Sequence, residues 1–230
     1  MNAVIYFSCT QRSETVARGL ASKLDYPLFK LTARTEKEIL RNTYESAVIV
    51  FPVHCQSYPL PMKNFFRYFS ADNITLIATY GSVNAGNAIY EAVRLLKQKP
   101  VAAAYVPCSH SYFNGSVEVR ELPKQFIEKI LSPCTVDIPK RKKNLFAGFL
   151  PSLRSRAIIK IKRNASCDKC GKCNGVCPMS AMDCGKTASR CIRCLKCVSC
   201  CERHSLEVKR SHMLTRYLEK THCDEIIIYI

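Results

Sequence analysis

Several features are scarce or absent in this chain of 230 residues. Glycine and proline number only 8 and 11, which excludes collagen-like and low-complexity proteins. No apolar run approaches the roughly 18 residues that span a bilayer, and residues 1–10 lack the charged and then apolar layout of a secretory signal. With 47% hydrophobic residues, the sequence predicts a folded, soluble, cytoplasmic protein.

Motifs of several enzyme classes are absent as well. No predicted strand is followed by G-x-G-x-x-G, the signature of nicotinamide binding, and no Walker loop indicates phosphoryl transfer. No Ser-His-Asp or paired-carboxylate constellation is legible. We therefore expect no catalytic side chains, and any enzymatic activity would belong to a bound cofactor.

Cysteine is abundant and clustered. Eleven of the 15 cysteines follow Asn164. A protein without a secretory signal keeps its thiols reduced, and clustered reduced thiols usually bind metal.

Basic residues are also unevenly distributed. The chain holds 35 Lys and Arg against 18 Asp and Glu, a net charge of +17. Residues 138–166 contain nine of these basic side chains and no acidic one. The change in composition predicts a domain over residues 1–137, a basic linker over 138–156 and a second domain over 157–230.

The first domain alternates apolar runs with stretches of helical periodicity. Alternation of this kind predicts an α/β fold with a five-stranded, doubly wound parallel sheet covered on both faces. The strands are expected at residues 3–7, 26–31, 46–51, 74–80 and 101–106, and the helices after residue 13 and at residues 35–43, 61–69, 85–97 and 121–131.

Three loops follow strands at the edge of the sheet where ligands bind in such folds. The first has hydroxyl groups and the start of a helix, which suit a phosphate, although such residues also serve as simple helix caps. The candidate ligand-binding residues in the three loops are Ser8, Thr10, Gln11, Arg12, Ser13, Pro52, Val53, His54, Tyr58, Thr79, Tyr80 and Gly81.

The motifs in these loops resemble those of flavodoxins. I-Y-F-S-C-T-Q-R-S-E-T (residues 5–15) is similar to the flavodoxin phosphate loop, Y-F-S-x-T-G-N-T. P-V-H-C-Q-S-Y-P (52–59) and T-Y-G-S (79–82) resemble the loops beside the flavin ring. The resemblance implies FMN as the ligand. Because Gln11 and Arg12 replace the Gly-Asn pair and Gln56 stands where glycine is common, the alternative is a flavodoxin fold with an empty pocket.

The second domain contains an internal repeat of cysteines. C-x2-C-x2-C-x3-C begins at Cys167 and returns 24 residues later at Cys191. Three thiolates at two-residue gaps surround one 4Fe-4S cluster, and the fourth cysteine reaches the other cluster. Set A is therefore predicted to be Cys167, Cys170, Cys173 and Cys201. Set B is predicted to be Cys191, Cys194, Cys197 and Cys177.

Two alternatives to this assignment remain open. Thiolates also bind zinc, although structural zinc sites usually separate two C-x2-C pairs by a longer loop. Cys200 competes with Cys201 as the fourth ligand of the second run, and we prefer Cys201 because it reproduces the x3 gap. The pattern resembles that of bacterial-type ferredoxins with two 4Fe-4S clusters.

The whole chain resembles the flavodoxin-ferredoxin fusion family. The resemblance implies an electron-transfer protein with two 4Fe-4S clusters and FMN, which relays electrons between low-potential redox partners. A flavin-free ferredoxin and an FMN-dependent oxidoreductase acting on a small molecule are the alternatives. The net positive charge favours redox partner proteins with acidic surfaces. Lys140–Leu150 also suits an anionic membrane surface, but we favour a solvated linker, and we expect no nucleic acid.

Overall fold

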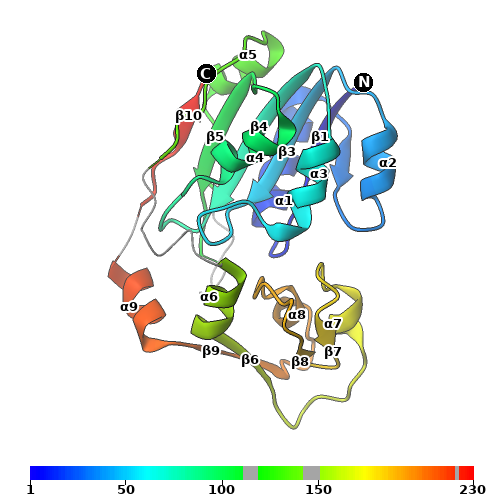
Figure 1. Ribbon diagram of the computed structural model, residues 1–230, viewed down its shortest axis with the longest axis vertical. Helices are drawn as coiled ribbons and strands as arrows, with labels where there is room; N and C mark the ends of the chain where they lie inside the picture. The colour runs from blue at the N-terminus through cyan, green and yellow to red at the C-terminus, as the bar shows by residue number, and fades with distance from the viewer. Residues whose placement is uncertain (111–118, 142–150, 221–222) are drawn as a thin grey trace.

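The structure is a computed structural model that describes residues 1–110, 119–141, 151–220 and 223–230. Its two halves are stacked along the long axis, with a sheet and its helices in one half and the cysteine runs in the other (Figure 1). No helix among the described residues is both long and apolar enough to cross a membrane.

Five parallel strands form most of the sheet in the mixed α/β half. Each of them begins and ends within two residues of the predicted positions. The six-stranded sheet has the order β10-β5-β4-β3-β1-β2. Without β10 this is the doubly wound order 2-1-3-4-5, which places a topological switch point between β1 and β3. The parallel strands are β1 (Asn2–Tyr6), β2 (Leu28–Lys30), β3 (Ser46–Pro52), β4 (Asn73–Tyr80) and β5 (Ala102–Pro107).

Helices cover both faces of the sheet because its strands are apolar on both. In β3, Ala47, Ile49 and Phe51 pack on one face, and Val48 and Val50 pack on the other. One layer contains α1 (Arg12–Leu24) and α5 (Lys124–Leu131). The opposite layer contains α2 (Glu36–Arg41), the short 3-10 helix η1 (Leu60–Met62), α3 (Lys63–Tyr68) and α4 (Ala88–Leu96).

The sixth strand was not predicted. Strand β10 (Ile227–Tyr229) follows the cysteine runs in sequence but pairs antiparallel with β5 of the first half. Its run of apolar residues has no period that distinguishes a strand from a buried helix. The chain thus returns to the sheet after forming the second half, and both termini lie at the end of the sheet remote from that half (Figure 1).

The second half is small and contains two short antiparallel ribbons. One ribbon pairs β6 (Ile159–Arg163) with β9 (Leu206–Arg210), and the other pairs β7 (Met182–Asp183) with β8 (Lys186–Thr187). Its core includes Ile159, Ile161 and Leu206. The helices are α6 (Pro151–Ile158), α7 (Lys172–Gly175), α8 (Lys196–Ser199) and α9 (His212–Lys220).

The predicted linker is partly structured. Arg141 is held to the sheet half by the buried Asn87, whose side chain accepts from the Arg141 backbone N–H at 2.7 Å and donates to its carbonyl at 2.8 Å. Residues 151–158 form α6. Residues 142–150, which include most of the segment considered for a membrane surface, lie outside the described residues.

Candidate functional site

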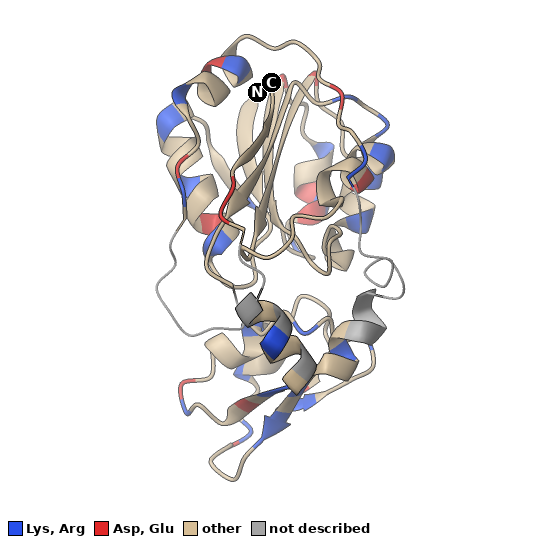
Figure 2. Ribbon diagram, turned by 90° about the vertical axis from the view of Figure 1, so that its left-hand side faces the viewer, with Lys and Arg blue, Asp and Glu red and all other residues tan. Residues whose placement is uncertain are grey.

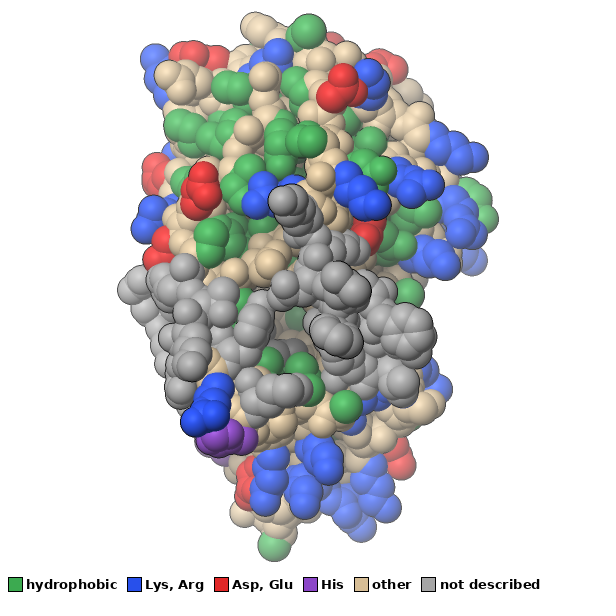
Figure 3. All heavy atoms as spheres, turned by 60° about the vertical axis from the view of Figure 1, so that its left-hand side comes forward, with side chains coloured by type: hydrophobic (Ala, Val, Ile, Leu, Met, Phe, Trp, Pro, Cys, Tyr) green, Lys and Arg blue, Asp and Glu red, His purple; other side chains and the backbone are tan. Residues whose placement is uncertain are grey.

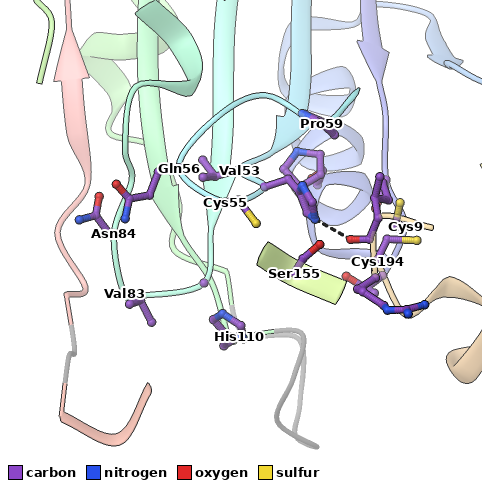
Figure 4. A pocket seen from close by; sticks show the side chains of 18 of the residues that line it. Cys9, Val53, Cys55, Gln56, Pro59, Val83, Asn84, His110, Ser155 and Cys194 are labelled. Atoms are coloured by element: carbon purple, nitrogen blue, oxygen red, sulfur yellow. Dashed lines mark hydrogen bonds between the residues drawn. The ribbon is translucent and has the colours of Figure 1, made fainter. Parts of the chain in front are cut away.

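A cavity lies where the carboxyl edge of the sheet meets the second half. It has a volume of about 190 Å³. Loops after β1, β3 and β4 form one side, and residues from the cysteine-rich half complete the wall (Figure 4). Seven of the predicted ligand-binding residues line it: Ser8, Thr10, Ser13, Pro52, Val53, His54 and Gly81.

The loop after β1 offers hydroxyl groups at the start of α1. Among the described residues, the side chains of Ser8 and Thr10 make no hydrogen bond, so both hydroxyls are available to a ligand. Ser13 is buried and its Oγ lies 2.7 Å from Thr79 Oγ1. Arg12 does not line the cavity; its Nη1 donates to the Thr10 carbonyl at 3.2 Å and its Nε to Ser109.

The loops after β3 and β4 interlock through a glycine. Gly86 has φ +61°, and a Cβ there would lie 2.3 Å from the Gln56 carbonyl oxygen, so this contact requires glycine. The Gln56 side chain lines the cavity and is only 8% exposed, and its Oε1 has no hydrogen-bond partner among the described residues. Gln56 therefore fills space beside the cavity and leaves one buried polar atom unsatisfied.

The side chain of His110 also lines the cavity, beside Gly81. It packs directly on Gly81, where a Cβ would lie 2.5 Å from His110 Cδ2. Burial lowers the pKa of His110 to about 4, helped by the charges of Arg12 and Arg210. The imidazole is therefore neutral at pH 7.

Five predicted ligand-binding residues lie away from the cavity lining: Gln11, Arg12, Tyr58, Thr79 and Tyr80. Tyr58 packs edge-on against Phe66, with ring centroids 5.7 Å apart. Tyr80 is buried in the sheet core and its hydroxyl donates to the Glu225 carbonyl. Both rings therefore serve packing in this structure.

The cysteine-rich half contacts the cavity directly. His54 Nε2 lies 2.7 Å from the Ile192 carbonyl oxygen, so this nitrogen carries the proton (Figure 4). Burial lowers the pKa of His54. Cys9, from the loop after β1, lies beside Cys194 (Figure 4), and their interaction raises the pKa of Cys9 and lowers that of Cys194. No local sequence signal indicated Ile192, Arg193, Cys194 or Cys9 as cavity residues, because these contacts join distant parts of the chain.

The two cysteine runs have the same backbone geometry. Lys169 and Arg193, 24 residues apart, both adopt left-handed φ values of 58° and 60°. Gly171 and Leu195 do the same at 76° and 61°. Helices α7 and α8 begin at matching positions, Lys172 and Lys196. The sequence repeat is therefore a structural repeat.

Each predicted cysteine set borders its own cavity. Set A lines a cavity of about 340 Å³, together with Cys184 and Cys200. Set B lines a much smaller cavity of about 10 Å³. Cys170 is exposed, whereas Cys191 and Cys197 are buried, so set A lies nearer to solvent than set B. Burial raises the pKa of Cys197 to about 12, so that thiol needs a cation to become a thiolate.

The fourth cysteines of the two runs have equivalent hydrogen bonds. Cys177 Sγ accepts from the Ala181 backbone N–H at 3.2 Å, and Cys201 Sγ accepts from the Ser205 N–H at 3.3 Å. Cys200 Sγ points elsewhere and donates to the Cys197 carbonyl at 3.3 Å. The geometry thus favours Cys201 over Cys200 as the counterpart of Cys177.

No group of three or more His, Cys, Asp or Glu side chains in the described ranges is close enough to share a single metal ion.

Comparisons with known proteins give only distant structural similarities. No protein-family model matches the chain, and no curated protein matches it. A solved structure of a "putative flavoprotein" from Bacteroides uniformis has 19% sequence identity and a TM-score of 0.33, covering 40% of this chain and 80% of that one. A second, from Bacteroides eggerthii, has 17% identity and the same TM-score, covering 40% of this chain and 78% of that one.

Proposed function

We propose that this protein is an electron carrier with two 4Fe-4S clusters and a flavin. The observation that carries the proposal is the pair of cavities, each bordered by the four cysteines that the crossed repeat assigns to one cluster. The clusters would supply one-electron transfer, and the flavin would supply exchange of one or two electrons. The fold would position these centres and limit their contact with water.

The arrangement of the cavities supports an ordered electron path. Ile192 and Cys194 line both the set B cavity and the cavity at the sheet edge. Of the two cysteine sets, set A is the more exposed. Electrons would therefore pass between the sheet-edge cavity and the surface through set B and then set A.

The chemistry of the sheet-edge cavity fits FMN. The available hydroxyls of Ser8 and Thr10 at the start of α1 suit its phosphate. The volume of about 190 Å³ is below the roughly 300 to 1,000 Å³ of typical ligand sites. Flavin binding would therefore require the side chains of Gln56 or His110 to move.

A basic face supports an acidic redox partner. Lys160 and Lys162 on β6 and Lys209 on β9 are exposed on the ribbon that these strands form, with Glu207 as the acidic exception. The ribbon also contains Leu206, which lines the set A cavity. Lys and Arg side chains gather over the end of the molecule formed by the second half (Figure 3). They follow its strands in Figure 2. Such a face would attract an acidic protein and guide it toward set A.

Metal analysis of two cysteine variants tests the clusters. The protein reconstituted without oxygen should contain about eight irons and eight sulfides per chain. Cys201→Ala should lose the signal of one 4Fe-4S cluster in electron paramagnetic resonance, whereas the neighbouring Cys200→Ala should keep both. Equal cluster content in the two variants would contradict the assignment, and zinc in place of iron would overturn the proposed function.

Flavin is tested separately by acid precipitation of the same protein, with the supernatant examined for released FMN. Flavin in the supernatant supports a three-centre carrier. If none is released even after incubation with FMN, the protein is a flavin-free ferredoxin joined to a flavodoxin-like sheet.

A further inference from the structure

One thiol of the sheet half contacts the cluster site of the other half. Cys9 is 8% exposed and lies in the loop between β1 and α1. Its thiol lies beside that of Cys194 (Figure 4), and the interaction between the two raises the pKa of Cys9 and lowers that of Cys194. Cys194 belongs to set B. The two labelled thiols lie together at one side of the sheet-edge cavity, opposite Gln56 and Asn84 (Figure 4).

The chemistry of a ligated cysteine sets the direction of a hydrogen bond between these two neighbours. A cysteine bound to iron is a thiolate and only accepts, so Cys9 would provide the S–H donor. Cys9 makes no side-chain hydrogen bond to any other residue in the part of the chain that the structure describes. Its proton is therefore not committed elsewhere, and the adjacent Cys194 sulfur (Figure 4) is its acceptor.

We propose that Cys9 raises the reduction potential of the set B cluster by donating its S–H to Cys194, and so tunes this cluster from the flavodoxin-like half. The inference rests on the proposed function. Reduction by one electron adds negative charge that is shared with the ligand sulfurs, so a hydrogen bond to such a sulfur strengthens on reduction and stabilises the reduced form. The set A cavity, by contrast, is lined by residues of the second half alone, and Cys9 is not among them.

The position of Cys9 gives this tuning a role in electron flow. Cys9 lines the sheet-edge cavity and touches a set B ligand, so it lies between the proposed flavin and the nearest cluster. A higher potential at set B makes that cluster the preferred electron acceptor from the cavity. Cys9 is thus a positioning residue that acts through Cys194, and it needs no contact with iron.

The test is a potentiometric titration of the reconstituted full-length protein, followed by electron paramagnetic resonance. In Cys9→Ala, one of the two cluster midpoints should become more negative, by up to about 59 mV, which is a tenfold change in the ratio of reduced to oxidised cluster. The second midpoint should not move. Cys9→Ser keeps a donor and should restore most of the difference.

Cys108→Ala is the matched control. Cys108 is another buried thiol of the sheet half, but it donates to the Tyr80 carbonyl at 3.2 Å and is not among the residues that line the sheet-edge cavity. Its loss should leave both midpoints unchanged. If Cys9→Ala keeps both clusters and both midpoints equal those of the unaltered protein, the role of Cys9 is overturned while the proposed function stands. Absence of both clusters from the unaltered protein would overturn the proposed function and this inference together.

Discussion

At the scale of the residue, single side chains decide how the sheet-edge cavity differs from an open ligand site. Gln56 and His110 each occupy part of it, Gln56 as a buried amide and His110 packed on Gly81. The sequence had already identified Gln56 as a residue in place of a common glycine. His110 was not identified, because its contact with Gly81 depends on how two loops meet.

Replacing Gln56 tests whether its side chain limits flavin binding. Gln56→Gly should bind FMN more tightly, because it enlarges the cavity and because glycine adopts the local φ of 64° without strain. Quenching of FMN fluorescence on titration with each protein measures the affinity. Lys97→Gly, at a left-handed position (φ 56°) remote from the cavity, controls for the change in backbone strain. Equal affinities in the two variants would show that Gln56 is no obstacle.

The buried imidazole of His110 predicts a loss of stability in acid. Its pKa is about 4 when folded and about 6.5 when unfolded, so the unfolded chain binds an extra proton between these values. The free energy of unfolding is therefore highest above pH 6.5 and decreases as the pH falls toward 4, with a loss of about 2 kcal/mol at pH 5. The free energy of unfolding in urea, measured at pH 7.5 and pH 5, checks this.

His110→Gln should weaken that dependence on pH, whereas His212→Gln, at an exposed position, should retain it. Protonation of the cysteine thiolates is common to both variants and cancels in the comparison. A pH dependence that is the same in both would contradict the assignment to His110.

At the scale of the element, local sequence specifies the backbone of the two cysteine runs but does not specify the last strand. Helices α7 and α8 and their left-handed neighbours follow from the spacing of the cysteines, which is local. Strand β10 depends on a partner more than 100 residues away, with Ile228 opposite Ala104. Its pairing attaches the end of the chain to the sheet half and so connects the halves a second time.

Shortening the side chain of Ile228 tests how much β10 contributes to the stability of the fold. Ile228 is half-buried against the core beside α1 and α5, so Ile228→Ala should lower the free energy of unfolding by about 1 to 2 kcal/mol. Ile230→Ala, at a 53% exposed position, should change it by less than about 0.5 kcal/mol. Denaturant titration measures both, and equal effects would show that β10 adds no packing energy.

At the scale of the whole molecule, the distribution of charge relates to partner choice. The net charge is +17, and the β6–β9 ribbon presents exposed lysines near set A. We predict that reduction by an acidic electron-donor protein slows as ionic strength rises, because salt screens the attraction between the two surfaces.

Charge reversal locates that attraction. Lys160→Glu with Lys162→Glu should slow reduction at low salt by about tenfold in stopped-flow measurements. The control is a double variant with the same change in net charge at another place in the molecule. It combines Lys124→Glu and Lys129→Glu, both on α5. A similar slowing in both would indicate an effect of net charge without a defined docking face.

The sequence by itself determined the alternation of strands and helices and the repeat of the two cysteine runs. Both are local: apolar periodicity specifies a strand or helix, and two-residue gaps bring thiols onto one turn. Only the tertiary structure decided that Cys9 meets Cys194, that His54 donates to Ile192, and that β10 joins the sheet. These contacts join residues 122 to 185 positions apart. The first two form where the carboxyl edge of the sheet meets the cysteine-rich half, and the third forms because β5 offers a free edge to the end of the chain.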